Sequence, residues 1–478
     1  MKKLVIIILS CVSFSVAAQT PITWMAGMNI AANSYGNMHP RIVTDANENP
    51  VVIWGRMSDQ SLFISRWNGT AFTMPVKVNP TWMTIATQSW QGPHIASKGD
   101  TLYVVMKRTP EASDTNHVYI VRSLNGGLTF SAPVQVDNIA DSVSRFPTVT
   151  IDDNGNPIVG FMKFDPLFGD ARWVVAKSTD LGNTFSTDVP ASGWSGVGAT
   201  VCDCCPGAIA CSNNTVAMLY RDNNSNIRDT WAGISANAAN SFSGGMGIDQ
   251  QNWMLMMCPS SGPDGVIIGD TLYSTFMNGV SGMNLVYFSK ASVSSMTGSA
   301  GIPVTGMFAG LTQQNYPRIA SSGNALAVIW KQVVSGTDQL ALQFTNNLAN
   351  GLPAAYDTVD LANVTNADVA ITDGNIFVVW QDDGAGTVKY RTGTFIPTGI
   401  FENQFNENQE IFLNPVAEQL IIPFEKFSSA ELFTIGGEKV LQVKQKITDV
   451  SSVANGFYLL KIILNENILI RKIIVQHK

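Results

Sequence analysis

The chain has 478 residues, of which 45% are hydrophobic, 9% aromatic and 14% charged. This composition excludes an intrinsically disordered or fibrous protein, since such chains lack the apolar content of a packed core or follow a strict glycine period. The net charge is −7, from 29 basic and 36 acidic side chains, and an acidic chain is not expected to bind nucleic acid, because phosphate binding needs clustered lysine and arginine.

The N-terminus has the pattern of a secretory signal peptide. Lys2 and Lys3 precede an apolar run, and the small residues at 16–18 stand before Gln19, which is the order of charge, apolar core and cleavage site in such peptides. We therefore assign residues 1–18 to a signal peptide. No later segment reaches the roughly 18 uninterrupted apolar residues of a transmembrane helix, so the sequence predicts export without a membrane span.

One unit recurs between residues 19 and 397: a proline, a short apolar strand, a polar hairpin and a second apolar strand that often ends in Trp or Phe. Successive copies are 53, 54, 59, 53, 58 and 51 residues apart and begin at Pro40, Pro93, Pro147, Pro206, Pro259, Pro317 and Asp368. A period near 50 with strands of four to six residues is typical of a β-propeller blade. The predicted fold is all-β, with seven blades, or six if one unit is an elaborated loop.

The last unit has only three predicted strands, at 369–372, 376–380 and 388–392. An open ring would leave sheet edges exposed, so we expect residues 22–26 to supply the fourth strand. The acidic hairpins at 45–49 and 152–156 are interpreted as Asx turns, in which the side chain bonds its own backbone. Calcium binding is the alternative, although neither hairpin has the full ligand series of a calcium loop.

Two hairpins carry a more specific pattern. Residues 178–185 read Ser-Thr-Asp-Leu-Gly-Asn-Thr-Phe, and residues 123–130 repeat the pattern with Asn at the acidic position. Both resemble the Asp-box, or bacterial neuraminidase repeat, of sialidase-like β-propellers. The resemblance implies a structural role on the rim of a blade for Ser123, Asn125, Gly127, Phe130, Ser178, Asp180, Gly182 and Phe185.

The C-terminal part has a different character. Residues 398–411 form a polar linker by composition, and residues 412–478 resemble the type A sorting domain of the type IX secretion system, with Gly436-Gly437 and Asn455-Gly456 between apolar strands. A generic small β-sandwich is the alternative interpretation. The resemblance implies recognition by the type IX secretion machinery, passage through the periplasm, and release or attachment at the outer-membrane surface.

Five cysteines remain beyond the signal peptide, and four of them lie near the starts of two adjacent units, with Cys205 and Cys258 at matching places: Cys202, Cys204, Cys205 and Cys258. The repeat register brings Cys205 and Cys258 together at one end of the ring, whereas Cys211 is expected in the core. Three interpretations are open: a disulfide between neighbouring blades, a soft-metal site for an ion such as copper(I), or a reactive thiol activated by a basic neighbour.

The unit that holds Cys205 continues with four charged residues, Arg221, Asp222, Arg228 and Asp229. The cysteine run followed by these residues resembles a recurring subgroup of sialidase-like proteins. The guanidinium groups could bind a carboxylate or sulfate, or they could pair with the neighbouring aspartates. Arg41 and Arg318 directly follow a repeat proline and are interpreted as ordinary repeat positions, so no sialidase arginine triad can be assigned.

The sequence therefore predicts a secreted or surface-attached, sialidase-like propeller that binds a glycan or another extracellular ligand at the mouth of its pore. An exo-α-sialidase or related glycoside hydrolase is the first alternative, and a copper-binding protein is the second.

Overall fold

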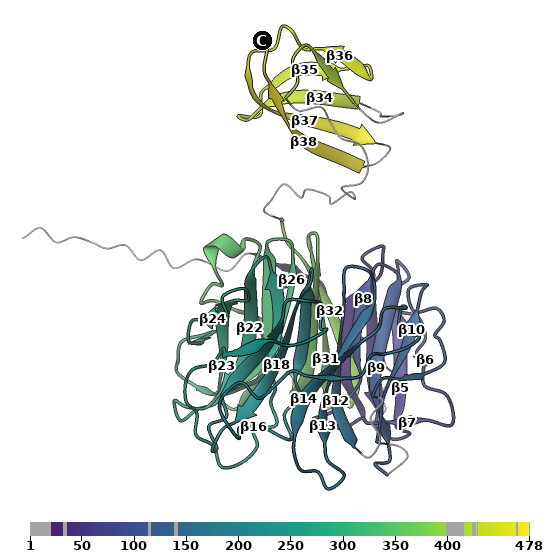
Figure 1. The fold of residues 1–478 in the computed structure, drawn as a ribbon, viewed down its shortest axis with the longest axis vertical. Coiled ribbons are helices and arrows are strands. Elements are labelled where there is room, and N and C mark those ends of the chain that lie inside the picture. The colour runs from purple at the N-terminus through teal and green to yellow at the C-terminus, as the bar shows by residue number, and fades with distance from the viewer. Residues whose placement is uncertain are drawn as a thin grey trace, which may run out of the picture. The chain divides into compact units, whose positions relative to one another are not determined.

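The computed structural model describes residues 21–31, 36–112, 116–137, 142–397, 415–422, 427, 429–464 and 467–477. The predicted signal peptide and linker lie outside these residues. The chain divides into two compact units, Met1–Thr398 and Gly399–Lys478 (Figure 1). A single 3-10 turn, η1 (Leu348–Asn350), interrupts the strands, and no helix in the described ranges is long and apolar enough to cross a membrane.

The first unit contains seven antiparallel sheets in chain order. The first is β3 (Asn37–Thr44), β4 (Pro50–Arg56), β5 (Ser61–Arg66) and β6 (Val76–Lys77). The second is β7 (Thr84–Ile85), β8 (His94–Lys98), β9 (Thr101–Thr109), β10 (Val118–Ser123) and β11 (Val134–Gln135). The third is β12 (Val143–Ile151), β13 (Pro157–Phe164), β14 (Arg172–Lys177) and β15 (Val189–Pro190).

The remaining four sheets follow the same plan. The fourth is β16 (Thr200–Val201), β17 (Ala208–Ser212), β18 (Thr215–Asn223), β19 (Thr230–Ser235) and β20 (Gly244–Gly247). The fifth is β21 (Asp264–Ile268), β22 (Thr271–Asn278), β23 (Leu285–Ser292), β24 (Thr297–Gly298) and β25 (Ile302–Pro303). The sixth is β26 (Leu311–Ser322), β27 (Ala325–Val334), β28 (Thr337–Thr345) and β29 (Asp357–Asp360). The seventh is β30 (Val364–Thr372), β31 (Asn375–Asp382), β32 (Thr387–Thr394), β1 (Thr23–Trp24) and β2 (Met28–Asn29).

The seven sheets close into a ring, which makes this unit a seven-bladed β-propeller. An innermost strand of each sheet contacts an innermost strand of the next, in the order β3, β8, β12, β17, β21, β26, β30 and back to β3. The N-terminal strand β1 pairs with β32, with Thr23 opposite Thr394 and Trp24 opposite Gly393. The predicted completion of the last sheet by the N-terminus is thus confirmed. We call the sheets blades 1 to 7.

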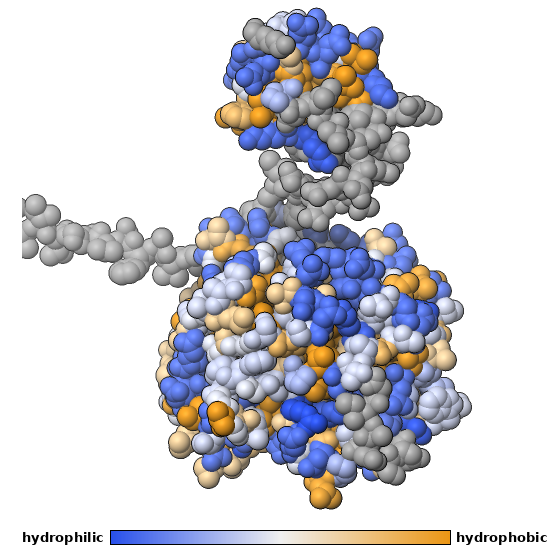
Figure 2. Space-filling model, viewed as in Figure 1, coloured by the Kyte–Doolittle hydropathy of each residue, from blue (hydrophilic) through white to orange (hydrophobic). Residues whose placement is uncertain are grey.

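The core lies between adjacent blades. The strand next to the innermost one is buried on both faces, and in all seven blades it holds an aromatic residue that is less than 3% exposed: Trp54, Tyr103, Phe161, Tyr220, Phe276, Trp330 and Trp380. A strand that is apolar on both faces fits an inner position in stacked sheets. Figure 2 shows hydrophobic and hydrophilic residues interspersed over the visible face of the propeller.

Hairpin side chains fix the turns on the propeller. Asp45 Oδ1 accepts the N–H groups of Asn47 and Asn49 at 2.8 and 2.9 Å, and Asp152 accepts that of Asn156 at 2.7 Å. In these hairpins the carboxylate oxygens bond the backbone of their own turn, which is the geometry of an Asx turn.

The second unit is a small β-sandwich. Its larger sheet has the order β35 (Lys439–Val443), β34 (Ser429–Thr434), β37 (Gly456–Leu464) and β38 (Asn467–Val475), and the smaller one pairs β33 (Gln419–Ile421) with β36 (Ile447–Asp449). Its core includes Leu420, Leu432, Val450 and Leu460, each at most 1% exposed.

Candidate functional site

A β-bulge recurs where the inner strands of several blades begin. In β3, β12 and β26 the pairing register shifts just before the repeat proline. The residue before each of these prolines has a positive φ: 56° at His39, 53° at Phe146 and 53° at Tyr316. Non-glycine residues seldom adopt this conformation, and bulges of this kind redirect side chains next to functional sites.

Side-chain amides stabilise the bulges. The backbone N–H of His39 donates to Gln381 Oε1 of blade 7 at 3.0 Å, and that of Phe146 donates to Gln91 Oε1 of blade 2 at 2.9 Å. In each case a glutamine side chain of the neighbouring blade accepts the backbone N–H that the bulge withdraws from the hydrogen bonds of its sheet. The unusual backbone is fixed by the ring, and it holds His39 and Arg41 at the pore.

A pocket, partly open to solvent, lies where these inner strands converge. Its lining contains two arginines, two histidines, three aromatic residues and several main-chain segments rich in glycine and proline. The polar and aromatic members that carry the argument are His39, Arg41, Trp90, His94, Phe146, Tyr316 and Arg318. None of the described lining residues is Asp or Glu.

Of the two arginines, Arg318 is the one whose charge is paired with carboxylates. Its Nε lies 3.2 Å from Asp368 Oδ1 and 3.3 Å from Asp264 Oδ2, and its Nη2 lies 3.1 Å from His94 Nε2. These contacts connect blade 6 with blades 7, 5 and 2. Burial would lower the pKa of Arg318, but the two aspartates outweigh it and raise that pKa, so the guanidinium is a fixed cation.

Arg41 is a buried cation that has no ion pair among the described residues. It is 8% exposed; its Nη1 donates to the Pro40 carbonyl at 2.7 Å and its Nη2 lies 3.2 Å from His39 Nδ1. Its buried Nε has no hydrogen-bond partner. Burial, and then repulsion by Arg318, lower the pKa of Arg41 to about 10, so it stays charged at neutral pH.

The two histidines of the pocket are neutral at pH 7. Burial lowers the pKa of both well below the ordinary value, and the nearby arginines lower it further. His39 Nε2 lies 3.1 Å from the Ser89 carbonyl, which fits a neutral ring that donates from Nε2 and accepts from Arg41 at Nδ1. The site therefore presents guanidinium donors and aromatic surface, an arrangement suited to an anionic ligand.

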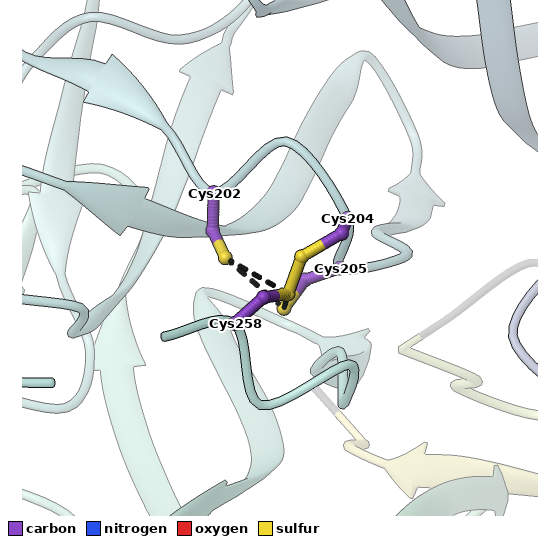
Figure 3. A group of neighbouring side chains, drawn as sticks. All are labelled: Cys202, Cys204, Cys205 and Cys258. Atoms are coloured by element: carbon purple, nitrogen blue, oxygen red, sulfur yellow. Dashed lines mark hydrogen bonds between the residues drawn. A yellow bond between two sulfur atoms is a disulfide. The ribbon is translucent and has the colours of Figure 1, made fainter. Parts of the chain in front are cut away.

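The four cysteines of the prediction lie together (Figure 3). Their Sγ atoms all lie within 4.8 Å of one another. Cys202, Cys204 and Cys205 come from the loop between β16 and β17, and Cys258 comes from the loop before β21. Cys204 and Cys258 form a disulfide with a Cα–Cα distance of 6.4 Å. Two of the pocket-lining residues, Pro206 and Ser260, belong to the same loops.

The remaining two thiols of the cluster are buried and in contact. Cys202 and Cys205 Sγ are 3.3 Å apart, and Arg228 Nη1 donates to Cys202 Sγ at 3.0 Å. The hydrogen bond from Cys205 and the charges of Arg228 and Arg221 outweigh burial and lower the pKa of Cys202 to about 6. Cys211 lies apart from the cluster on β17, where its Sγ is 3.5 Å from the Asn213 carbonyl.

None of the four charged residues predicted as ligand candidates lines the pocket. Arg221 is 0% exposed and donates to the carbonyls of Ser261, Arg228 and Met277 at 3.2, 2.7 and 2.6 Å. Besides Cys202, Arg228 bonds the Leu255 carbonyl at 2.8 Å.

The two aspartates beside these arginines are also buried. Asp229 accepts the N–H groups of Asn252 and Trp253 at 2.7 and 2.8 Å. Asp222 is 1% exposed, and burial raises its pKa to about 6. The contacts of Arg221, Arg228 and Asp229 thus favour a bracing role over ligand binding, whereas the buried Oδ1 of Asp222 has no hydrogen-bond partner.

The rim turns predicted at 123–130 and 178–185 have the same pattern of hydrogen bonds. Ser178 Oγ donates to Asp180 Oδ1 at 2.7 Å and accepts the Gly182 N–H at 2.8 Å. Ser123, Asn125 and Gly127 make the equivalent bonds at 2.9 and 2.9 Å. The aromatic residues that end the two turns, Phe130 and Phe185, are partly buried and pack against the cores between blades.

A third turn of this kind was missed in the sequence. Ser235 donates to Asn237 at 2.9 Å and accepts the Ala239 N–H at 3.0 Å. Alanine stands where the other turns have glycine, and Ala239 has a φ of 60°. That substitution hid the pattern, although Ser-x-Asn and the following Phe242 were visible.

Arg41, Arg318, His39 and His94 were also not predicted as site residues. Their repeat positions suggested a structural role, and only the ring closure places blades 1, 2 and 6 around one pocket. The available signal was that an arginine directly follows the repeat proline in two of the seven units.

The comparison with protein families identifies the C-terminal unit. Residues 410–476 match the secretion system C-terminal sorting domain. The chain therefore carries a type IX sorting signal, which directs export to the cell surface or into the medium. No curated protein matches the chain.

Several solved structures resemble the chain at low identity. A protein of unknown function from Dyadobacter fermentans has 12% identity and a TM-score of 0.45, over 68% of this chain and 98% of that one. An α-L-arabinofuranosidase from Fusarium graminearum has 12% identity and a TM-score of 0.44, over 68% of this chain and 99% of that one. The Trypanosoma rangeli sialidase has 11% identity and a TM-score of 0.43, over 92% of this chain and 84% of that one. These values carry no inference about chemistry, and the propeller assignment stands on the closed order of the seven sheets.

Proposed function

We propose that the propeller binds an acidic glycan, one with a carboxylate or sulfate group, in the pocket at the mouth of its pore. One observation carries the proposal: Arg41 is a buried cation without a carboxylate partner among the described residues, and it lies in the same pocket as Arg318. A buried charge without a partner is costly, and an anionic ligand would provide that partner.

The rest of the lining fits a saccharide. Trp90, Phe146 and Tyr316 give apolar surface, and Trp90 is 37% exposed. Ring faces of this kind combined with a few fixed polar groups are typical of small-molecule sites. We also propose that the three serine–Asx turns of the rim are Asp-box repeats, which stabilise the blades on which the pocket is built.

Binding is favoured over hydrolysis by the absence of Asp and Glu from the described lining residues. Most glycosidases need two carboxyl groups beside the scissile bond. An exo-α-sialidase would instead use a tyrosine and three arginines, as the family resemblance implies, whereas the described lining holds two arginines.

The test is calorimetric binding of 3′-sialyllactose and of a galacturonate trimer to the full chain, with lactose as the neutral control. We expect binding of an acidic sugar and none of lactose. Arg41→Ala should weaken that binding by roughly 10–100-fold, since a charge-assisted hydrogen bond contributes about 1.5–3 kcal/mol.

The matched control is Arg172→Ala, because Arg172 is an exposed arginine of blade 3 that pairs with Asp170. It should leave binding unchanged. Equal affinity for lactose and sialyllactose would contradict the proposal, and release of sialic acid from sialyllactose would replace it with the hydrolase alternative.

A further inference from the structure

The cysteine cluster is not used by the proposed glycan site, and its geometry has a chemistry of its own. We propose that the four cysteines form a thiol–disulfide relay of two exchanging pairs, Cys202 with Cys205 and Cys204 with Cys258. The proposal is independent of what the pocket binds.

The two pairs differ in their access to solvent. Cys202 and Cys205 are 0% and 1% exposed and are separated by two residues, the spacing of dithiol oxidoreductases. Cys204 and Cys258 are partly exposed and form the disulfide. The outer pair can therefore exchange with a thiol in solution, while the inner pair is protected.

The pairs are close enough to react with each other. Cys202 Sγ lies 3.5 Å from Cys258 Sγ, and Cys205 Sγ lies 3.6 Å from it. Thiol–disulfide exchange proceeds by attack of a thiolate on one sulfur of a disulfide, and both inner sulfurs are in contact with the same sulfur of the outer pair.

The inner pair is electrostatically asymmetric, which assigns the two roles of an exchange reaction. Arg228 Nη1 donates to Cys202 Sγ at 3.0 Å, so its charge acts on that sulfur. Burial raises the pKa of Cys205 well above its ordinary value, whereas that of Cys202 is lowered. Cys202 is thus the attacking thiolate and Cys205 the resolving thiol.

The reaction balances without another oxidant. The Cys202 thiolate attacks Cys258 Sγ, a Cys202–Cys258 bond forms, the Cys204–Cys258 bond breaks, and Cys204 leaves as a thiolate that takes up a proton. Cys205 then loses its proton and attacks Cys202 Sγ, so Cys258 is released as a thiol. The inner pair is oxidised by two electrons and the outer pair is reduced by two.

The exchange changes how the pocket wall is held. In the state described, the Cys204–Cys258 bond joins the loop before β17 to the loop before β21, and Pro206 and Ser260 of these loops line the pocket. After exchange the remaining disulfide lies within the first loop, and no covalent bond connects blades 4 and 5 at this point.

The first experiment maps the disulfides of the full chain after acid quenching and alkylation of thiols. We expect one disulfide of the cluster per chain, distributed in the wild type between Cys204–Cys258 and Cys202–Cys205. In Cys205→Ser the second step is blocked, so the mixed Cys202–Cys258 linkage should rise by roughly 10-fold. Cys211→Ser is the matched control and should map as the wild type does, because Cys211 lies outside the cluster.

Two results of this map would overturn the relay. One is Cys204–Cys258 as the sole linkage in the wild type and in Cys205→Ser. The other is zinc or copper bound at one ion per chain by all four sulfurs, which would make the cluster a metal site.

A second measurement avoids dependence on the folding of Cys205→Ser. Thiolate absorbance at about 240 nm of the wild-type chain should rise with a midpoint near pH 6, the pKa to which Cys202 is lowered, and Cys202→Ser should lack this step. The groups that face Cys202 are Cys205, Cys258, Arg228 and Arg221. Arg228→Met should move the midpoint up by about one pH unit. A wild-type midpoint at about pH 8 or above would overturn the assignment of Cys202 as the attacking thiolate.

Discussion

The two pairs of arginines in the propeller differ in what surrounds their guanidinium groups. Arg41 and Arg318 line the pore pocket on blades 1 and 6, where their partners are histidines, carboxylates and one carbonyl. Arg221 and Arg228 lie on blade 4, where main-chain carbonyls and a cysteine sulfur accept their hydrogen bonds. A count of arginines near the pore cannot separate these two situations.

The difference shows that burial alone does not mark a binding residue. Arg221 has less exposure than Arg41, yet all three of its nitrogens donate to the protein. Arg41 keeps one buried donor without a partner. We infer that the arginine with unsatisfied donors is the one available to a ligand, and the following variants test that contrast.

The largest effect is expected from Arg221→Met. The change leaves three buried carbonyls without a donor, and removing one partner of a buried hydrogen bond costs about 1–3 kcal/mol for each group left unsatisfied. We expect the free energy of unfolding, measured with urea, to fall by about 3–5 kcal/mol. Arg172→Met, an exposed arginine, should change it by less than about 0.5 kcal/mol. Equal stability of the two variants would show that Arg221 is not a brace.

A smaller effect of opposite sign is expected from Asp249→Asn. Burial and then the nearby Asp229 raise the pKa of Asp249 to about 7. The folded protein therefore holds a proton that the unfolded chain has lost between about pH 4 and pH 7, so stability falls as the pH rises through this range. The asparagine side chain does not titrate, so the Asp249→Asn variant does not lose this stability as the pH rises.

We expect the Asp249→Asn variant to match the wild type at about pH 5 and to exceed it by about 2 kcal/mol at about pH 8 in urea unfolding. The hydrogen bond from Asn278 to Oδ2 of residue 249, at 2.8 Å, can be kept by the amide oxygen. A variant that is less stable than the wild type at the higher pH would show that the ionised carboxylate is needed near Arg221.

The sequence repeat predicted most of the fold. Proline spacing and hairpin chemistry predicted the blades, and the exposed-edge argument predicted the pairing of the N-terminus with the last blade. Individual strands were harder: β16 and β17 are parts of one inner strand that the cysteine loop interrupts, and the apolar pattern does not show where such a loop leaves the sheet.

The site was less predictable because it depends on contacts between distant residues. The sequence placed Cys205 beside Cys258 because each directly precedes a proline near the start of adjacent units, and in the structure the two residues lie in the loops before β17 and β21. It did not place Arg41 and Arg318 in one pocket, because their blades are joined through the closed ring and not through consecutive units. Whether a guanidinium is satisfied by carbonyls, as at Arg221, depends on atoms that no residue pattern describes.

The smallest expected effect is the contribution of His39, a pocket residue, to the pH dependence of the free energy of unfolding. The pKa of His39 is lowered well below its ordinary value by burial first, and then by Arg41 and Arg318, against the hydrogen bond to Ser89. Asp368 and Asp264 contact Arg318 and are not among the residues that line the pocket. Below about pH 6.5 His39 is protonated in the unfolded chain but remains neutral in the folded protein. The free energy of unfolding therefore decreases as the pH falls.

The matched variant is His39→Gln, whose amide can still donate to Ser89 and accept from Arg41 but cannot take up a proton. Between about pH 7.5 and pH 5.5 the wild type should lose about 1 kcal/mol more unfolding free energy than His39→Gln does. An acidic ligand bound in the pocket should reduce this difference, because its negative charge favours the imidazolium and offsets the repulsion by the two arginines. If the ligand leaves the difference unchanged, it does not contact the group that Arg41 and His39 form, and the glycan site lies elsewhere.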